Sequence, residues 1–268
     1  MSMICADELA TADFADFAEV LSKLQCNDKP VDSDFNHFLT ELRRLMTQDE
    51  RLCQRAGATP AVPVQWLRFI DEQDHGRRLA LLTEWSDFAA EWPSVQDFLR
   101  TMLKRLYVLR EQDGALSLLY LYTVGGNDLN FFRGRAPITE VPERLRPIWD
   151  RVPAKFRDFY TQLHDGWTFL PANSMGPLPV EDWVFLSDDK FDIDDETARR
   201  LPIDISRTVA VFHNGAGDYL CLNCAGPGKA TGVIWWHEDP ENPEPVDFWG
   251  VLDAWVGIFL EEADRHGA

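Results

Sequence analysis

Three apolar runs in the C-terminal half constrain the fold of this chain more than any other feature. In chain order they are TVAVFHN, DYLCLN and GVIWWH, and glycine-rich stretches separate them. Short runs rich in β-branched and aromatic residues are typical of strands, and short connections that contain Gly join antiparallel neighbours. Asn214-Gly215 and Gly217-Asp218 supply residues that tolerate a positive φ. The sequence therefore predicts an antiparallel meander whose first turn is a tight hairpin.

The segments around this meander extend the prediction to an α+β domain. Pro153 and Gly166 are expected to begin and end a short helix, and residues 247–262 have the apolar spacing of a final helix. Two strands, WTFLPA and WVFLS, and the short helix IDDETARRL fill the interval. This order of elements predicts a mainly antiparallel sheet packed by helices.

The first half of the sequence favours helices. Apolar residues recur at helical spacing within residues 14–24 and 35–45. Two more amphipathic segments follow, at about 64–90 and 94–112. We therefore expect this half to be mainly helical.

Residues 115–123 fit either a strand or a buried helix, although the glycines that follow favour a hairpin. Prolines between residues 137 and 153 then indicate a boundary near residue 143. The expected protein has an α+β fold, with a mainly helical N-terminal domain (residues 1–143) and a second domain (residues 144–268) that contains the antiparallel sheet.

The formal net charge of −19 limits the classes of partner. Proteins that bind nucleic acid generally present a basic surface, so no direct nucleic-acid partner is expected. An acidic surface favours a basic protein partner, although it also serves solubility alone. The N-terminus lacks the pattern of a signal peptide, and no apolar run has the length of a membrane span. Five scattered cysteines are typical of a reducing compartment, so we expect a cytoplasmic protein without membrane contact.

Cys221 and Cys224 form a CxxC pattern that suggests a metal or redox site. Successive side chains of a strand alternate between faces, so the two thiols are expected to diverge. A structural zinc site needs about four ligands, and only His213 and His237 are near enough in the meander to contribute. A redox CxxC normally begins a helix, whereas this one ends a strand. The pattern favours structural cysteines, with a metal site or a Cys-His enzyme as an alternative class.

The glycines of the meander also resemble phosphate-binding glycines. Gly215 and Gly217 lack the helix that a dinucleotide-binding loop requires, and Asp218 repels phosphate. The GPGK sequence lacks the upstream Gly and the following Ser or Thr of a P-loop. Nucleophile and zinc-protease motifs are missing as well. The sequence therefore predicts no catalytic residue, no bound cofactor and no metal.

Two acidic segments are the best candidates for a partner-binding surface. Residues 181–196 contain eight acidic residues and one Lys, and residues 238–247 contain five acidic residues and no base. Two tryptophans precede the second segment, and Trp anchors with steering carboxylates are typical of protein interfaces. Solvated loops explain the same pattern without a partner. The residues predicted to contact a partner are Asp188, Asp189, Asp192, Asp194, Asp195, Trp235, Trp236, Glu238, Asp239 and Glu241.

Residues 144–262 resemble the SUKH superfamily, which includes fungal cell-wall regulators and bacterial toxin-immunity proteins. The resemblance depends on an ordered set of features: an aromatic helix that leads into Gly166-Trp167, the Asn214-Gly-x-Gly-Asp218 turn between two apolar strands, the VIWWH strand and the final helix. Asn223 departs from the pattern, because many members have an acidic residue there.

The resemblance implies a binding protein rather than an enzyme. Bacterial members typically neutralise a cognate secreted toxin by direct binding, and many of these toxins are nucleases. A nuclease presents a basic cleft for phosphate, which a chain of charge −19 is suited to cover. We therefore expect an immunity protein that occludes the active or substrate-binding site of a basic, nuclease-like toxin. A regulatory or scaffold protein without a toxin partner is the alternative.

Overall fold

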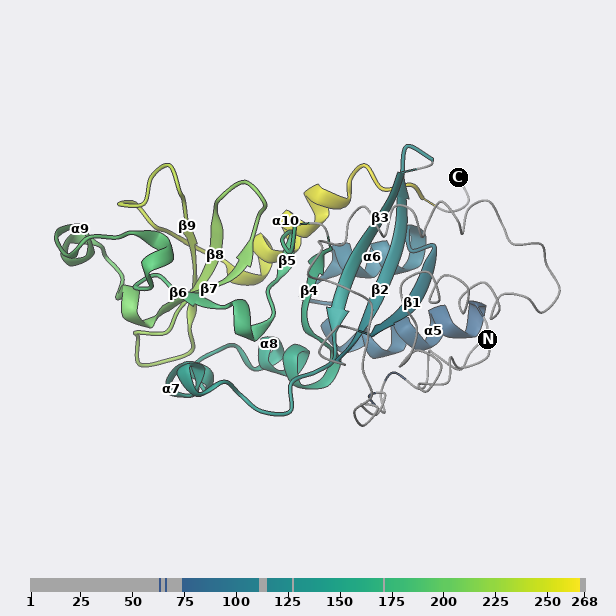
Figure 1. The fold of residues 1–268 in the computed structure, drawn as a ribbon, viewed down its shortest axis with the longest axis horizontal. Helices are drawn as coiled ribbons and strands as arrows, with labels where there is room; N and C mark the ends of the chain where they lie inside the picture. The colour runs from purple at the N-terminus through teal and green to yellow at the C-terminus, as the bar shows by residue number, and fades with distance from the viewer. Residues whose placement is uncertain are drawn as a thin grey trace.

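Two antiparallel sheets lie in the two halves of the described part of the chain, and helix α10 runs between them (Figure 1). The computed structural model describes Pro63, Trp66 and residues 74–110, 115–126, 128–170 and 172–265. The helices predicted within residues 14–24 and 35–45 lie outside these described residues.

The first sheet has four strands in the order β1-β2-β3-β4. Their bounds are Arg105–Arg110, Leu116–Val124, Asp128–Arg135 and Asp165–Phe169. β2 and β3 form the predicted hairpin, in which Gly125 and Gly126 have φ values of 60° and 84°. We expected helical structure through residue 112, and this prediction is wrong for residues 105–110, which form β1. Pairing with β2 satisfies the β1 backbone and outweighs the local helical preference.

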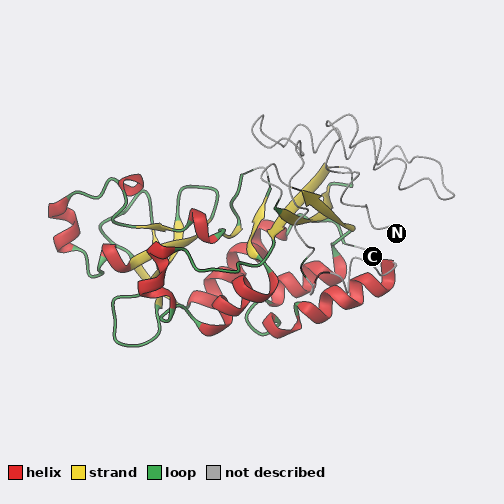
Figure 2. Cartoon of the chain, turned by 60° about the horizontal axis from the view of Figure 1, so that its bottom comes forward, coloured by secondary structure: helices red, strands yellow, loops and turns green. Residues whose placement is uncertain are grey.

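Helices gather along one face of this first sheet (Figure 2). α5 spans Asp74–Glu84, the 3₁₀ helix η1 spans Ser86–Phe88, and α6 spans Pro93–Thr101. The Phe98 ring of α6 lies 5.5 Å from the Tyr122 ring of β2, between ring centroids. Trp85 donates a hydrogen bond from Nε1 to the Tyr120 hydroxyl at 3.3 Å. Buried aromatic side chains therefore hold the helices on the sheet.

The second sheet contains the predicted meander. Its strands follow the order β10-β9-β8-β7-β5, with β6 also paired to β7. In chain order, β5 to β10 are Gly176–Pro177, Val184–Phe185, Thr208–His213, Tyr219–Asn223, Thr231–Trp235 and Glu244–Val246. Gly215 and Gly217 have φ values of 82° and 109° in the turn between β7 and β8. The predicted hairpin and antiparallel pairing are confirmed.

Short helical segments connect the strands. In chain order they are η2 (Glu143–Leu145), α7 (Arg146–Trp149), α8 (Ala154–Asp158), the π-helical η3 (Phe159–Leu163), η4 (Val180–Asp182), η5 (Asp189–Phe191), α9 (Asp195–Arg200) and η6 (Ile205–Arg207). The predicted helix after Pro153 corresponds to α8 and η3 together. The predicted IDDETARRL helix corresponds to α9.

The last helix, α10 (Phe248–Leu260), packs against both sheets. Its Phe259 ring lies 5.8 Å from Phe132 of β3, and its Trp255 ring lies 5.5 Å from Phe212 of β7. Asp253 of α10 also accepts two hydrogen bonds from Ser94 of α6, each 2.9 Å long. The predicted α+β class is confirmed. The domain boundary near residue 143 stays a prediction, and strands from both sides of it pair in the first sheet.

Candidate partner-binding surface

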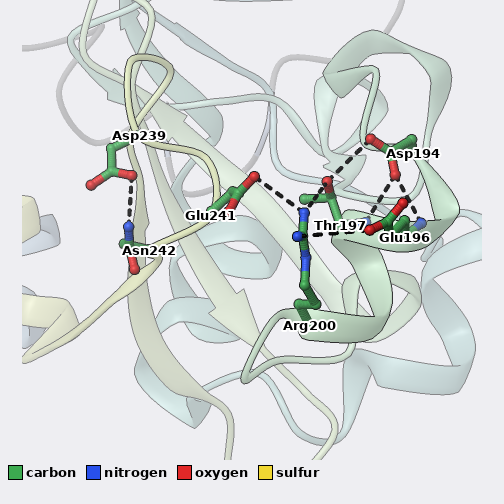
Figure 3. A network of polar contacts seen from close by, with 7 residues as sticks. All are labelled: Asp194, Glu196, Thr197, Arg200, Asp239, Glu241 and Asn242. Carbon is green, nitrogen blue, oxygen red and sulfur yellow. Dashed lines mark hydrogen bonds and ion pairs between the residues drawn. The ribbon is translucent and has the colours of Figure 1, made fainter.

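The two acidic segments predicted from the sequence meet at the far end of the second sheet (Figure 3). Arg200 of α9 lies between them, with Nη2 3.3 Å from Oε1 of Glu241 and Nη1 3.9 Å from Oε1 of Glu196. Asn242 donates a 2.8 Å hydrogen bond to Asp239, which orders the second segment. We call the acidic residues of 188–196 and 238–241 the acidic surface. One arginine thus connects two segments that are about 40 residues apart in the sequence.

Helix α9 forms because its sequence matches the polarity of a helix. Asp194 is the N-cap, and its Oδ1 accepts hydrogen bonds from the amides of Glu196 and Thr197, both at 2.8 Å. The bond from the Thr197 amide is the main reason that the pKa of Asp194 is lowered. Acidic residues fill the first turn, and Arg199 and Arg200 occupy the last, as the helix dipole favours. The Asp194 carboxylate is therefore committed to the helix backbone.

The turn before α9 presents further carboxylates to solvent. Asp188 accepts a 3.0 Å hydrogen bond from the Phe185 amide and lies 3.6 Å from Arg144. Asp189 and Asp192 are exposed, and Asp192 adopts a φ of 48°, which Asp tolerates better than most residues. The Asp188 carboxylate therefore has structural partners, whereas the carboxylates of Asp189 and Asp192 are exposed to solvent.

The two tryptophans predicted to anchor a partner differ in burial. Trp235 is only 7% exposed and packs against Phe191 with ring centroids 4.9 Å apart. Trp236 is half-buried, and its Nε1 donates a 3.2 Å hydrogen bond to Glu244. Strand alternation explains the difference, because adjacent residues face opposite sides. Trp235 therefore packs beneath the turn that contains Phe191, and of the two tryptophans Trp236 has the larger exposed area for contact with a partner.

The remaining predicted contact residues are solvent-exposed. Asp195 pairs with Arg199 at 3.7 Å on α9. Glu238, Asp239 and Glu241 are exposed in the loop between β9 and β10. The role of Arg200 in joining the segments was not foreseen from the sequence. Its spacing of four residues from Glu196 indicates a helical pair, but no sequence signal indicates the contact with Glu241.

The cysteines of the CxxC pattern are buried and free. Burial raises the pKa of Cys224 to about 11 and that of Cys221 further still. Both thiols are therefore protonated at neutral pH and are poor nucleophiles. Within the described residues, no group of three or more His, Cys, Asp and Glu side chains is placed to hold a metal ion.

The histidines near the meander turn have structural partners. His237 Nδ1 lies 2.7 Å from Oδ1 of Asp218, and the His213 ring stacks on Tyr219 with centroids 4.7 Å apart. Burial is the main cause that lowers the pKa of His213. A Cβ at Gly217 would lie 2.9 Å from the His237 ring, so the turn and the histidine pack closely. These contacts fix the turn that the sequence predicted.

The same turn is held by Asn214. Its Oδ1 accepts hydrogen bonds from the amides of Ala216 and Asp218 at 2.8 and 3.1 Å. Amides that point inward to Asn214 do not face a phosphate group. The turn therefore closes a hairpin, as predicted, and does not have the geometry of a dinucleotide-binding loop.

Comparison with known proteins identifies one family. Residues 138–255 match the model of the SMI1 / KNR4 family (SUKH-1), which confirms the resemblance inferred for residues 144–262. The N-terminal part of the chain has no family match. Neither the curated proteins nor the solved structures compared with the chain give a match. Among the described helices, none has the length and apolarity needed to cross a membrane.

Proposed function

We propose that this chain is an immunity protein that binds a cognate protein toxin and neutralises it by covering the active or substrate-binding site. The observation that carries the proposal is the SUKH-1 match over the region that forms the acidic surface. The toxin is expected to be basic and nuclease-like. The chain acts by binding, from the cytoplasm, without catalysis and without a cofactor.

The acidic surface supports a steering role in this complex. A nuclease cleft that holds phosphate is basic, and complementary potentials accelerate encounter with an acidic partner. Asp189, Asp192 and Glu238 are exposed, and their carboxylates do not serve as helix N-caps as that of Asp194 does. These carboxylates can therefore face a basic partner without a change in the fold.

A binding surface also needs an apolar contribution, because exposed charge pairs contribute little affinity. Trp236 is half-buried and lies beside the exposed carboxylates of the β9–β10 loop. Buried Pro243 and half-buried Pro240 stiffen this loop, which lowers the entropy lost when a partner orders it. We place Trp236 at the centre of the interface and the carboxylates at its rim.

Co-expression with a candidate toxin from a neighbouring gene tests the proposal. Wild-type protein should restore growth and form a complex that weakens as salt is added, because salt screens the surface charges. The double variant Asp189→Lys/Glu238→Lys should bind about tenfold more weakly or worse at low salt, because like charges then face each other.

Glu261→Lys/Glu262→Lys is the matched control, because it reverses two exposed charges just after α10. This control should bind the toxin like the wild type. Equal losses in the two double variants would place the interface outside the acidic surface. A toxin that is neither bound nor neutralised by the wild-type chain would rule out the immunity function.

A further inference from the structure

Residues 178–183, which we call the crossing segment, connect β5 and β6 of the second sheet and pass the start of β4 in the first sheet. The side chains of Tyr160 in η3 and Asp165 in β4 form hydrogen bonds with its backbone. The Tyr160 hydroxyl donates a 2.6 Å hydrogen bond to the carbonyl of Leu178, and Asp165 Oδ1 accepts a 2.8 Å bond from the amide of Val180. The crossing segment is thus a direct contact between the two sheets.

The backbones are close at this contact. Gly166 adopts a φ of 79°, and a Cβ placed there would lie 2.5 Å from the backbone nitrogen of Pro179. No side chain fits between these backbones without movement. The backbone next to Asp165 is therefore packed tightly against the crossing segment.

Charged groups of both signs face Asp165. Arg135 of β3 pairs with Glu181 of the crossing segment, and its positive charge favours an ionised Asp165. Glu181 and Asp182 oppose ionisation, because they bring two more negative charges to the same place. Tyr160 of η3 is also close enough to Asp165 to be influenced by its charge. The charged groups that act on Asp165 are therefore Arg135, Glu181 and Asp182.

Burial decides the balance among these groups. It is the largest influence on Asp165 and raises the pKa of this carboxyl to about 6, although the Val180 amide and Arg135 act in the opposite direction. His164 and Tyr160, which adjoin Asp165, both stay neutral between pH 5 and 8. Burial lowers the pKa of His164 to about 3 and raises the pKa of Tyr160 well above its usual value.

We propose that Asp165 makes the contact between the two sheets sensitive to pH, so that the crossing segment is held most firmly in mildly acidic solution and loosens toward neutral pH. The ionised carboxylate is disfavoured where it lies, and opening of the crossing segment exposes it to water. The protonated carboxyl group has no such preference for water, so it does not favour opening. This device is independent of the proposed toxin binding.

The direction of the effect follows from proton linkage. The folded protein holds the Asp165 proton more tightly than the unfolded chain, whose Asp titrates near pH 4. The stability contributed by protonation is fully present below about pH 4 and is lost as the pH rises through about 6. A shift of about two pH units corresponds to about 100-fold in the unfolding equilibrium constant. We expect at least about tenfold, because Asp165 is partly exposed.

Asp165→Asn in the full-length chain tests the proposal. Asn keeps an acceptor for the Val180 amide and has no charge at any pH. From pH 5 to pH 8, the unfolding constant of the wild type should rise by up to about tenfold relative to that of the variant. Hydrogen-exchange protection of residues 178–183 should fall over the same range in the wild type and stay constant in the variant.

Asp150→Asn is the control, because Asp150 is exposed and pairs with Arg157. Its pH profile should follow that of the wild type. Parallel profiles for the wild type and Asp165→Asn would overturn the proposal, as would equal loss of protection in the two proteins. If Asp165→Asn does not fold, the carboxyl carbon of wild-type Asp165 is titrated by NMR: a midpoint near 6 supports the proposal, and a midpoint near 4 overturns it.

Discussion

Carboxylates accept backbone hydrogen bonds both at the sheet contact and on the acidic surface, yet their pKa values are shifted in opposite directions. Asp165 accepts one amide at the sheet contact, and burial raises its pKa to about 6. Asp194 accepts two amides on the acidic surface, and these bonds lower its pKa. Amide hydrogen bonds favour the ionised carboxylate at both residues, but burial outweighs them at Asp165 and does not at Asp194.

The largest expected effect concerns the backbone at the sheet contact. Gly166→Ala places a Cβ against Pro179 in a left-handed conformation, so it should lower the free energy of unfolding by about 3 kcal/mol. Gly226→Ala is the matched control, because a Cβ there meets nothing within 4 Å. Chemical denaturation measures both. Equal stability of the two variants would show that the sheet contact yields more easily than its geometry indicates.

A smaller effect is expected from the N-cap of the acidic surface. Asp194→Ala should unfold the start of α9 locally and increase amide exchange at Glu196 and Thr197, whereas Asp194→Asn retains an acceptor and should change little. Because the pKa of Asp194 is lowered, its contribution is present above about pH 4 and is lost as the pH falls further. This pH dependence is opposite to that of Asp165. The same pH dependence at both sites would show that burial does not distinguish the two carboxylates.

The smallest effect concerns the exposed ion pairs that join the acidic segments. Arg200→Gln should change the unfolding free energy by only about 0.5 kcal/mol, because its pairs with Glu241 and Glu196 are solvent-exposed. It should still speed amide exchange in residues 238–242. Arg199→Gln removes a pair within α9 alone and should leave that loop unchanged. Faster exchange in both variants would mean that Arg200 does not position the loop.

Local pattern predicted much of the second sheet correctly. The meander, its glycine turn and α9 depend on alternation, positive φ and capping, which act between neighbours in the sequence. The same reasoning was wrong for β1, where helical spacing is present but a neighbouring strand supplies the backbone partners. It also listed both Trp235 and Trp236 as partner contacts, although Trp235 is only 7% exposed and Trp236 is half-buried.

The sequence by itself determined the α+β class, the resemblance to SUKH proteins and the presence of two acidic segments, because composition, periodicity and turn residues are local properties. Only the tertiary structure decided that Arg200 connects those segments, that Trp235 is buried, and that Asp165 lies at the contact between two sheets. The physical reason is that burial and charge pairing depend on which distant residues surround a side chain. A carboxyl group has the same chemistry wherever it stands in the sequence, and its neighbours in space set whether charge is favoured there.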